Sequence, residues 1–419
     1  MAAERRRPRR VPVTTGDERA GRALSSATQL LVRQLGDAFR AVYQAVDEVQ
    51  RRTVDLTLDV MTLEAFKPRW IGATVRTTTD QCVDALRVFA SVRGLQLGYR
   101  ELVNKTEVFN LVRHARRFIG ADVRATDETV AQLVGVAYSL PPFLRIWAIE
   151  GLGHDYADWA REQGEPARLL AADSALPDGA LTMLHAGLGL SAADARLREA
   201  TEFDADETFR KTVRQFRDEC DRSARRGYAG CAYESLGLVT RAFHPALMTA
   251  VDRALADAQA ELRPYFWHGV GRALYFSPLE FVPGVSSPWI RIDADATDDA
   301  ARLNATAGLA WATALVNMRQ PEIVGALLPN VVTSSRDAIA DGVASAFAMA
   351  LDTDLSNPFV PAFCGYVPSD PISKRVWCAT IPSIEAVDRI RRAAKEQTAL
   401  ERLFMYAPLA GAGSQECTA

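Results

Sequence analysis

The stretch RPYFWHGVGRALYF, residues 263–276, places two glycines two positions apart inside an apolar segment with helical spacing. Trp267 and His268 precede the glycines, and Tyr275 follows them. Three interpretations are open: a glycine loop that cradles a phosphate, a catalytic or metal centre, or a point where two helices pack closely. The choice depends on the rest of the chain, because the pattern of this stretch recurs.

Six segments share the pattern, and they are spaced 34 to 48 residues apart. They read IEGLGHDYA, HAGLGLSAA, YESLGLVTR, WHGVGRALY, TAGLAWATA and ADGVASAFA. The first small residues of the six are Gly151, Gly187, Ser235, Gly269, Gly308 and Gly342, and two positions later come Gly153, Gly189, Gly237, Gly271, Ala310 and Ala344. Six positions before the first small residue, four segments carry Arg145, Arg263, Arg302 and Arg336. Two agreements of this kind indicate an internal repeat.

Each motif lies in a segment of helical periodicity, and a second short helix fits between motifs, as in residues 244–262 and 321–332. A unit of about 35 residues with two helices has the size of a helical-hairpin repeat. Small residues at i and i+4, such as Gly269 and Ala273, share one helix face and let a neighbouring helix approach closely. The sequence therefore predicts an all-α fold of tandem, solenoid-like helical hairpins.

The pattern also divides the chain. We expect a disordered basic arm (1–24), an N-terminal helical region (25–136), the helical-repeat domain (137–355), a C-terminal helical or loop cap (356–405) and a flexible tail (406–419). Residues 276–296 are punctuated by Pro and Ser and contain the alternating run Trp289-Ile290-Arg291-Ile292. This alternation predicts a short β-like insertion in the repeat domain.

Composition excludes several classes of protein. The net charge of −3 provides no basic field for a nucleic acid, and no apolar run is long enough for a membrane span. The basic N-terminus lacks the apolar core of a secretory signal. Six cysteines without a CxxC pair are typical of thiols in a reducing compartment. These features favour a cytoplasmic location.

The motif resembles a known family. An arginine six positions ahead, an aromatic residue, a Glu or small polar residue, and then G-x-G or G-x-A are features of the UnbL-type proteins, a bacterial family of unknown function encoded in enediyne polyketide gene clusters. The matching stretches are RIWAIEGLGHDYA, RPYFWHGVGRALYF and RDAIADGVASAFAMAL, and the similarity covers about residues 140–352. The resemblance implies a role in bacterial secondary metabolism, such as antibiotic biosynthesis. It implies no particular reaction and no catalytic residues.

The glycines do not form a nucleotide signature. G-x-G-x-x-G is incomplete in every copy, no strand is predicted before the motifs, and the chain has no GK[ST] loop. The acidic residues 293–299 begin like a calcium loop, but Asp298 stands where the loop glycine belongs, so we interpret them as a loop and helix cap. We predict no cofactor and no metal.

Ionisable side chains recur at one motif position, which Glu150, Glu234 and His268 occupy in their respective units. His154 follows Glu150 by four residues, a spacing that suits a carboxylate–imidazole pair or two metal ligands. Our candidate catalytic residues are Glu150, His154, Glu234 and His268. Alternatively, each is a hydrogen-bonded, half-buried residue at a helix crossing. We expect the recurring arginine to bond the carbonyls that end the preceding helix or a carboxylate in the next unit; alternatively, it binds an anionic ligand.

Our leading hypothesis is a biosynthetic protein that binds a hydrophobic, polyene-like small molecule and, if it is an enzyme, catalyses a cofactor-independent cyclisation or isomerisation. The candidate substrate-binding residues are Trp147, His185, Tyr233, Trp267, Tyr275, Trp311 and Arg263. The alternative is a non-catalytic helical-repeat scaffold for partner proteins of a biosynthetic complex. A closed apolar cavity that contains Glu234 and His268 would favour ligand chemistry, whereas burial in helix contacts would favour the scaffold.

Overall fold

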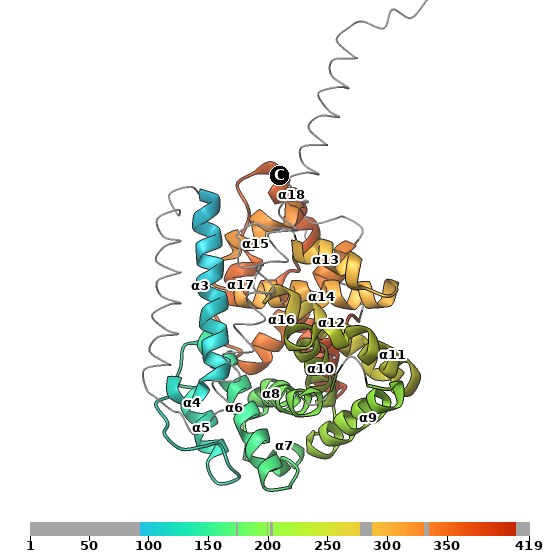
Figure 1. Ribbon diagram of the computed structural model, residues 1–419. Coiled ribbons are helices and arrows are strands. Elements are labelled where there is room, and N and C mark those ends of the chain that lie inside the picture. The colour runs from blue at the N-terminus through green and yellow to red at the C-terminus, as the bar shows by residue number, and fades with distance from the viewer. Residues whose placement is uncertain are drawn as a thin grey trace, which may run out of the picture. The chain divides into compact units, whose positions relative to one another are not determined.

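The computed structural model describes residues 93–172, 175–198, 200–201, 204–276, 287–330 and 335–407. These residues belong to one compact unit, Thr74–Ala419. Across these ranges the regular structure is helical and contains no strand, which confirms the all-α class (Figure 1). The basic arm, residues 25–92 of the N-terminal helical region and residues 408–419 of the tail lie outside the described part of the chain.

Six long helices carry the six copies of the motif, and we call them the motif helices. They are α6 (Pro142–Glu162), α8 (Asp178–Leu197), α10 (Ala229–Phe243), α12 (Arg263–Tyr275), α14 (Asp299–Val316) and α16 (Arg336–Thr353). Most of their residues are buried; in α14, for example, the buried positions run without a break from Asn304 to Val316. A helix that is apolar on all sides lies inside a protein. The motif helices therefore form the centre of the described unit.

The remaining helices surround this centre. Before it come α3 (Arg93–Arg113), α4 (Ala115–Phe118) and α5 (Val130–Ala137). Between the motif helices lie α7 (Arg168–Ala171), α9 (Asp206–Ser223), η1 (Pro245–Leu247), α11 (Met248–Ala258), η2 (Ala260–Leu262), α13 (Ser287–Asp295), α15 (Pro321–Leu327) and η4 (Leu328–Asn330). After it come α17 (Phe359–Cys364), α18 (Pro371–Thr380), α19 (Ile384–Glu396) and η6 (Leu400–Phe404). The short helices expected within residues 244–262 and 321–332 are thus present.

The small residues of the motif are the points where successive motif helices touch. A methyl group added at Gly269 in α12 would overlap the carbonyl oxygen of Glu234 in α10, and one added at Gly237 in α10 would overlap that of Phe266 in α12. In this pair the residue number rises along one helix while it falls along the other, so α10 and α12 cross in antiparallel directions. Gly153 and Gly187 make the same reciprocal contact between α6 and α8. The expected role of the motif in close helix packing is confirmed.

The motif helices do not form an open row of hairpins. α16 packs against α14 and also against α8, near the other end of the series. The Thr182 hydroxyl of α8 lies 3.4 Å from the Asp352 carboxylate of α16, and the Arg145 guanidinium of α6 donates to Asp354 at 2.7 Å. In a solenoid each unit contacts only its sequence neighbours. Successive motif helices do pack against one another along the whole series, and the added contact of α16 with α8 closes the row.

The predicted β-like insertion is also corrected. Residues 277–286 lie outside the described part, but the alternating run Trp289-Ile290-Arg291-Ile292 lies inside helix α13. Pro288 stands in the first turn, where its missing N–H costs nothing. Ile292 is buried as α13 packs against α12 and α14, and Arg291 pairs with Asp295 one turn later. Four residues of alternation were too few to separate a strand from a helix.

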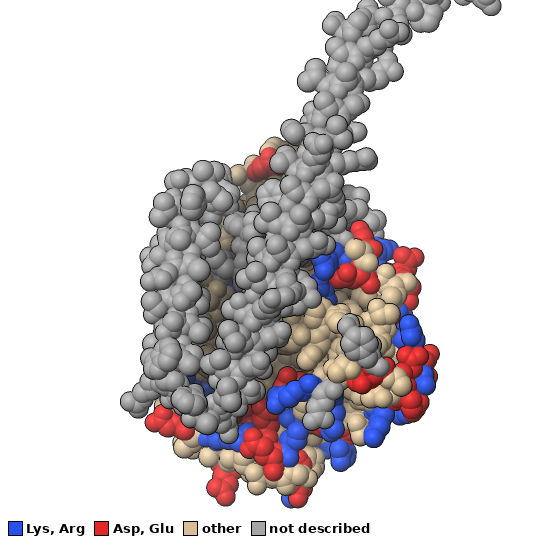
Figure 2. All heavy atoms as spheres, viewed as in Figure 1, with Lys and Arg blue, Asp and Glu red and all other residues tan. Residues whose placement is uncertain are grey.

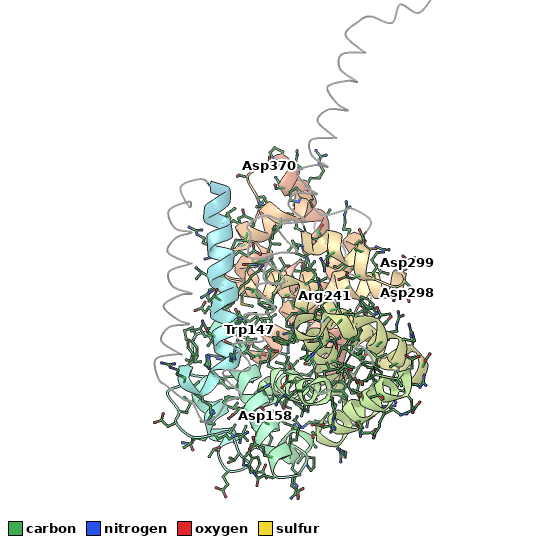
Figure 3. The ribbon with its side chains drawn as sticks, viewed as in Figure 1. Trp147, Asp158, Arg241, Asp298, Asp299 and Asp370 are labelled. Carbon is green, nitrogen blue, oxygen red and sulfur yellow. The ribbon has the colours of Figure 1, made fainter. Side chains whose placement is uncertain are left out.

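The recurring arginines lie in the first turns of their helices, and Arg145, Arg263 and Arg302 pair with carboxylates. Arg263 is the first residue of α12, and its Nε and Nη2 donate to the two Asp252 oxygens at 2.7 and 3.1 Å. Its Nη1 donates to Asp298 at 2.7 Å, and Asp298 itself caps α14 by accepting from Ala301 N at 2.8 Å. Figure 3 places Asp298 beside Asp299 at the edge of the unit. Arg263 thus joins three segments and is not free to bind a ligand.

Two further findings concern the cysteines and membranes. Cys220, Cys231 and Cys364 are free and buried. Cys378 is disulfide-bonded, so the expectation that all six cysteines are thiols is wrong at that position. Among the described residues, no helix is both long and apolar enough to cross a membrane.

Candidate functional site

A buried ionic cluster connects three motif helices. It consists of Glu150 from α6, Glu234 from α10, and His268 and Arg272 from α12, and we call it the central cluster. Arg272 Nη1 donates to Glu234 Oε2 at 2.7 Å, and Nη2 donates to Glu150 Oε1 at 3.1 Å. His268 Nδ1 lies 2.9 Å from Glu234 Oε1. None of the four residues is more than 2% exposed.

Local sequence explains why these groups meet. His268 and Arg272 are separated by four residues, so they lie on one face of α12. Gly269 and Gly271 stand between them and allow α10 and α14 to approach the α12 backbone. Because the helices are so close, the Glu234 side chain spans from α10 to both groups. Packing that excludes water strengthens each of these charged hydrogen bonds.

Two aromatic rings cover the central cluster. The Arg272 guanidinium lies over the Trp311 ring of α14, with 4.5 Å from its Cζ to the ring centroid, which is a cation–π contact. The Phe404 ring of η6 lies 5.6 Å from that of Trp311 and 6.5 Å from that of His268, measured between centroids. His268 and Trp311 are 6.3 Å apart in an edge-to-face arrangement. The C-terminal η6 therefore closes the site on the side of the imidazole.

Burial sets the protonation of the cluster. Desolvation lowers the pKa of His268 and outweighs the raising effect of the Glu234 carboxylate. Desolvation also raises the pKa of Glu150, although Arg272 opposes that shift. The pKa of Arg272 is raised, because the two carboxylates outweigh its burial. The lowered pKa favours the neutral form of His268, and Arg272 is held between the carboxyl groups of Glu234 and Glu150.

Only one of the two ring nitrogens of His268 has a hydrogen-bond partner. Glu234 Oε1 accepts a hydrogen bond from Nδ1–H, which fixes the tautomer and leaves the lone pair on Nε2. Nε2 is fully buried and has no hydrogen-bond partner. An unpartnered buried polar atom costs about 1–3 kcal/mol. An imidazole oriented by a carboxylate and open at Nε2 is the arrangement of a general base.

The other two candidate histidines, His154 and His185, have partners outside the central cluster. His154 stands at the surface of α6 and its ring pairs with Asp158 at 3.4 Å, so the expected Glu150–His154 pair is replaced by two different partners. His185 is buried, donates from Nδ1 to Leu181 O at 2.6 Å and accepts at Nε2 from Arg225 N at 3.0 Å. Burial lowers the pKa of His185 to about 4. Among the described residues, no group of three or more His, Cys, Asp or Glu could hold a metal ion.

The candidate aromatic residues are dispersed. Trp311 alone among them contacts the central cluster through a described contact. Trp267 donates to Asp252, Tyr275 accepts from Asn317 Nδ2 at 2.6 Å, and Tyr233 donates to Asp221 on α9. Trp147 is buried in α6 beside Phe143, and Figure 3 places it among the motif helices. Trp267, Tyr275 and Tyr233 thus have hydrogen-bond partners of their own, whereas Trp147 packs against Phe143 and its indole N–H has no partner.

Arg272 and Phe404 were missed by sequence reasoning. Arg272 could have been found, because a charged residue four positions after His268 shares its face in a helix that is otherwise apolar. Phe404 carries no such signal. It comes from a 3₁₀ segment more than a hundred residues after α12, and only the tertiary packing brings it to the site.

Figure 2 shows Lys, Arg, Asp and Glu intermixed over the described part of this face, without a field of one sign. A hollow of about 470 Å³ lies along α8 and α9 and is lined by Arg196, Gln215, Asp218, Asp221 and Arg222. Its lining is polar, of both charges, and open to solvent, unlike the apolar, largely enclosed sites that hold small molecules.

Comparison with known proteins assigns no family. No family model, no curated protein and no solved structure matches this chain.

Proposed function

We propose that this protein binds a hydrophobic, polyene-like intermediate of bacterial secondary metabolism in the cytoplasm and transfers a proton on it through His268, in a cofactor-independent isomerisation or cyclisation. The observation that carries the proposal is the buried Nε2 of His268, which has no partner while Nδ1 is bonded to Glu234. His185, by contrast, has both of its ring nitrogens bonded to backbone groups. The resemblance to UnbL-type proteins supports the class of pathway.

Each residue of the central cluster has a separate role in the proposed proton transfer. Nε2 takes the substrate proton, and the imidazolium that forms is stabilised by Glu234 through the Nδ1–H bond. Arg272 holds the Glu234 carboxylate through its other oxygen and fixes the position of the pair. Glu150 balances the second terminal nitrogen of Arg272. Positioned bases of this kind contribute about 10²–10⁴-fold to a rate.

His268 is fully buried and the Phe404 ring of η6 lies beside its imidazole, so a substrate would reach Nε2 by movement of η6. A covered site excludes water from a reactive intermediate, which suits polyene chemistry. The short η6 has few hydrogen bonds to the rest of the unit: Glu401 N donates to Gly227 O at 2.9 Å and Gly230 N to Glu401 Oε2 at 3.3 Å. We therefore propose that η6 is the segment that opens to admit the substrate to His268.

The test replaces His268 by Gln in the producing strain and measures pathway intermediates by mass spectrometry. We expect turnover to fall at least about a hundredfold while the purified variant stays folded. The matched control is His154→Gln, which alters an imidazole at the surface and should leave turnover unchanged. Normal turnover in a folded His268→Ala, Glu234→Ala double variant contradicts the proposal.

The second candidate is a non-catalytic scaffold for partner proteins. It is favoured by the complete burial of Glu234 and His268 in helix contacts, since a cluster of this kind also fixes how helices pack. Mass spectrometry of small molecules retained by the purified protein separates the two functions. A retained pathway intermediate supports the enzyme, whereas an intact pathway in the folded double variant supports the scaffold.

A further inference from the structure

Three unpartnered polar atoms lie on the three side chains that meet beside η6. Besides His268 Nε2, they are Arg272 Nε and Trp311 Nε1, and all three are buried. The side chains contact one another, since the Arg272 guanidinium lies over the Trp311 ring and the His268 ring stands at its edge. Buried polar groups in proteins almost always have partners. Three unpartnered atoms on adjoining side chains therefore point to something that binds among them.

The chemistry of the three atoms defines what fits. Arg272 Nη1 and Nη2 donate to Glu234 and Glu150, whereas the buried Nε–H donor has no partner. Trp311 Nε1–H is a donor only, and His268 Nε2 is an acceptor while Nδ1 carries the proton. Two donors and one acceptor match a single oxygen atom, either a carbonyl that becomes an enol or a hydroxyl.

We infer that Arg272 Nε–H and Trp311 Nε1–H form a donor pair for a ligand oxygen, and that the substrate of the central cluster is a carbonyl-bearing molecule and not a pure hydrocarbon. The reaction step rests on the proposed function, whereas the donor pair does not. A permanently charged carboxylate fits less well, because Arg272 already pairs with two glutamates and a further buried anion would be uncompensated. Arg272 and Trp311 are thereby assigned as catalytic residues.

The donor pair completes a balanced step. The C–H bond next to the carbonyl breaks, its proton bonds to His268 Nε2, and its electron pair forms the C=C bond of an enolate. The carbonyl π pair moves to the oxygen, where the donor pair stabilises the charge as it develops. Return of the proton from Nε2 to another carbon gives the isomer. Alternatively, the enolate carbon bonds to a second carbonyl carbon, the π pair of that carbonyl moves to its oxygen, and this oxygen takes the proton from Nε2. Neither outcome needs an oxidant, a reductant or a metal.

The first test is a high-resolution crystal structure of the full chain without added ligand. We expect one ordered oxygen atom within about 2.7–3.2 Å of both Arg272 Nε and Trp311 Nε1, since a buried polar site that is not filled by ligand holds water. Separate partners for the two nitrogens, or no oxygen between them, would overturn the donor pair. This result does not depend on whether the protein catalyses a reaction.

The second test uses phenol and toluene, which have nearly the same shape and differ in the hydroxyl. Phe404→Ala opens a ring-sized space beside His268 and Trp311, and apolar cavities of that kind bind benzene-sized molecules. We expect this variant to bind phenol about tenfold or more tightly than toluene by calorimetry. Adding Trp311→Phe, which keeps a ring but removes the N–H, should reduce that preference and leave toluene binding unchanged.

Equal binding of phenol and toluene, or a phenol preference that survives Trp311→Phe, would overturn the inference. If Phe404→Ala does not fold, the ordered oxygen in the wild-type crystal decides the question. A confirmed donor pair together with normal pathway turnover in the folded His268→Ala, Glu234→Ala variant would separate the two proposals. The oxygen site would then stand while the catalytic function failed.

Discussion

Asp341 is a buried carboxylate, and only one of its two oxygens has a hydrogen-bond partner. It lies in α16 with 4% of its surface exposed, and its Oδ2 accepts from Ala407 N at 3.3 Å while Oδ1 has no partner. Desolvation raises the pKa of Asp341 to about 7, against the opposing effect of the Ala407 hydrogen bond. A raised folded-state pKa stabilises the fold fully below the unfolded pKa, and this stability is lost as the pH rises to about 7.

Asp341→Asn removes that charge at every pH. We expect the variant to gain stability relative to the wild type as the pH rises, by about 2–3 kcal/mol more at pH 8 than at pH 5. Urea unfolding of both proteins at the two pH values measures the difference. Asp337→Asn, at an exposed position of the same helix, is the matched control and should show little change. A pH-independent difference for Asp341→Asn would show that the carboxyl titrates normally.

At the same scale, the motif alignment predicted part of the central cluster. Glu234 and His268 occupy equivalent motif positions on successive helices, and this equivalence is why the antiparallel crossing of α10 and α12 brings them together. His154 did not join them, because four residues after Glu150 the helix face has turned to solvent, where Asp158 pairs with it. The spacing of residues in a helix shows which side chains share a face. Which of these side chains are buried depends on the helices that pack against that face.

Among the elements, the crossing of α12 with α14 depends on Gly271. A Cβ atom at this position would overlap the carbonyl oxygen of Ala305, which is backbone and cannot turn aside. Gly271→Ala should therefore separate the two helices and destabilise the protein by about 1–3 kcal/mol or more. Thermal and urea unfolding measure the loss, and movement of α14 would also displace Trp311 from Arg272.

The control substitution is Gly135→Ala in α5, where a Cβ atom would meet nothing within 4 Å. Because alanine favours a helix interior over glycine, this variant should be more stable by up to about 1 kcal/mol. The two changes add the same methyl group, so opposite signs isolate the packing effect. Equal effects would mean that the motif glycines are not closely packed.

For the helices, the sequence predicted that motif helices would cross closely, but it did not predict the direction in which they cross. The repeated small residues indicated close helix crossings, and the carbonyls of Glu234, His268 and Ala307 do meet the glycines of the next motif helix. The antiparallel direction was not predictable, because the connections vary from α13 to the longer α9 and the small residues of the motif allow close packing in either direction. The α13 segment shows how burial on two neighbouring helices outweighs a short alternating pattern.

Across the described unit, the closed packing depends on contacts between residues far apart in the chain. Arg145 and Asp354 are 209 residues apart, and Arg272 and Glu150 are 122 apart. A repeat pattern describes neighbours and says nothing about such pairs, so it favoured an open solenoid. The closure matters for the central cluster, because it brings α6 close enough to α12 for Glu150 to accept a hydrogen bond from Arg272.

The C-terminal segment completes this closure, and its removal gives the last prediction. Leu400, Leu403 and Phe404 are at most 3% exposed, and η6 packs against α10, α12, α16 and α19. Each such side chain contributes about 1.5–3 kcal/mol on burial. A chain shortened after Gln397 should therefore lose roughly 5 kcal/mol or more, which is comparable to the whole stability of many domains.

The control chain ends after Ala407 and keeps η6 with its hydrogen bonds, including Tyr406 N to Asn304 Oδ1 at 2.8 Å. Urea unfolding followed by circular dichroism should place the control near the full chain and the shorter chain far below both. The shorter chain also uncovers the imidazole that Phe404 shields, so any folded fraction should show faster chemical modification of His268. Equal unfolding midpoints and equally slow modification in all three chains would mean that η6 rests on a core already closed without it, and the entrance to His268 would have to lie elsewhere.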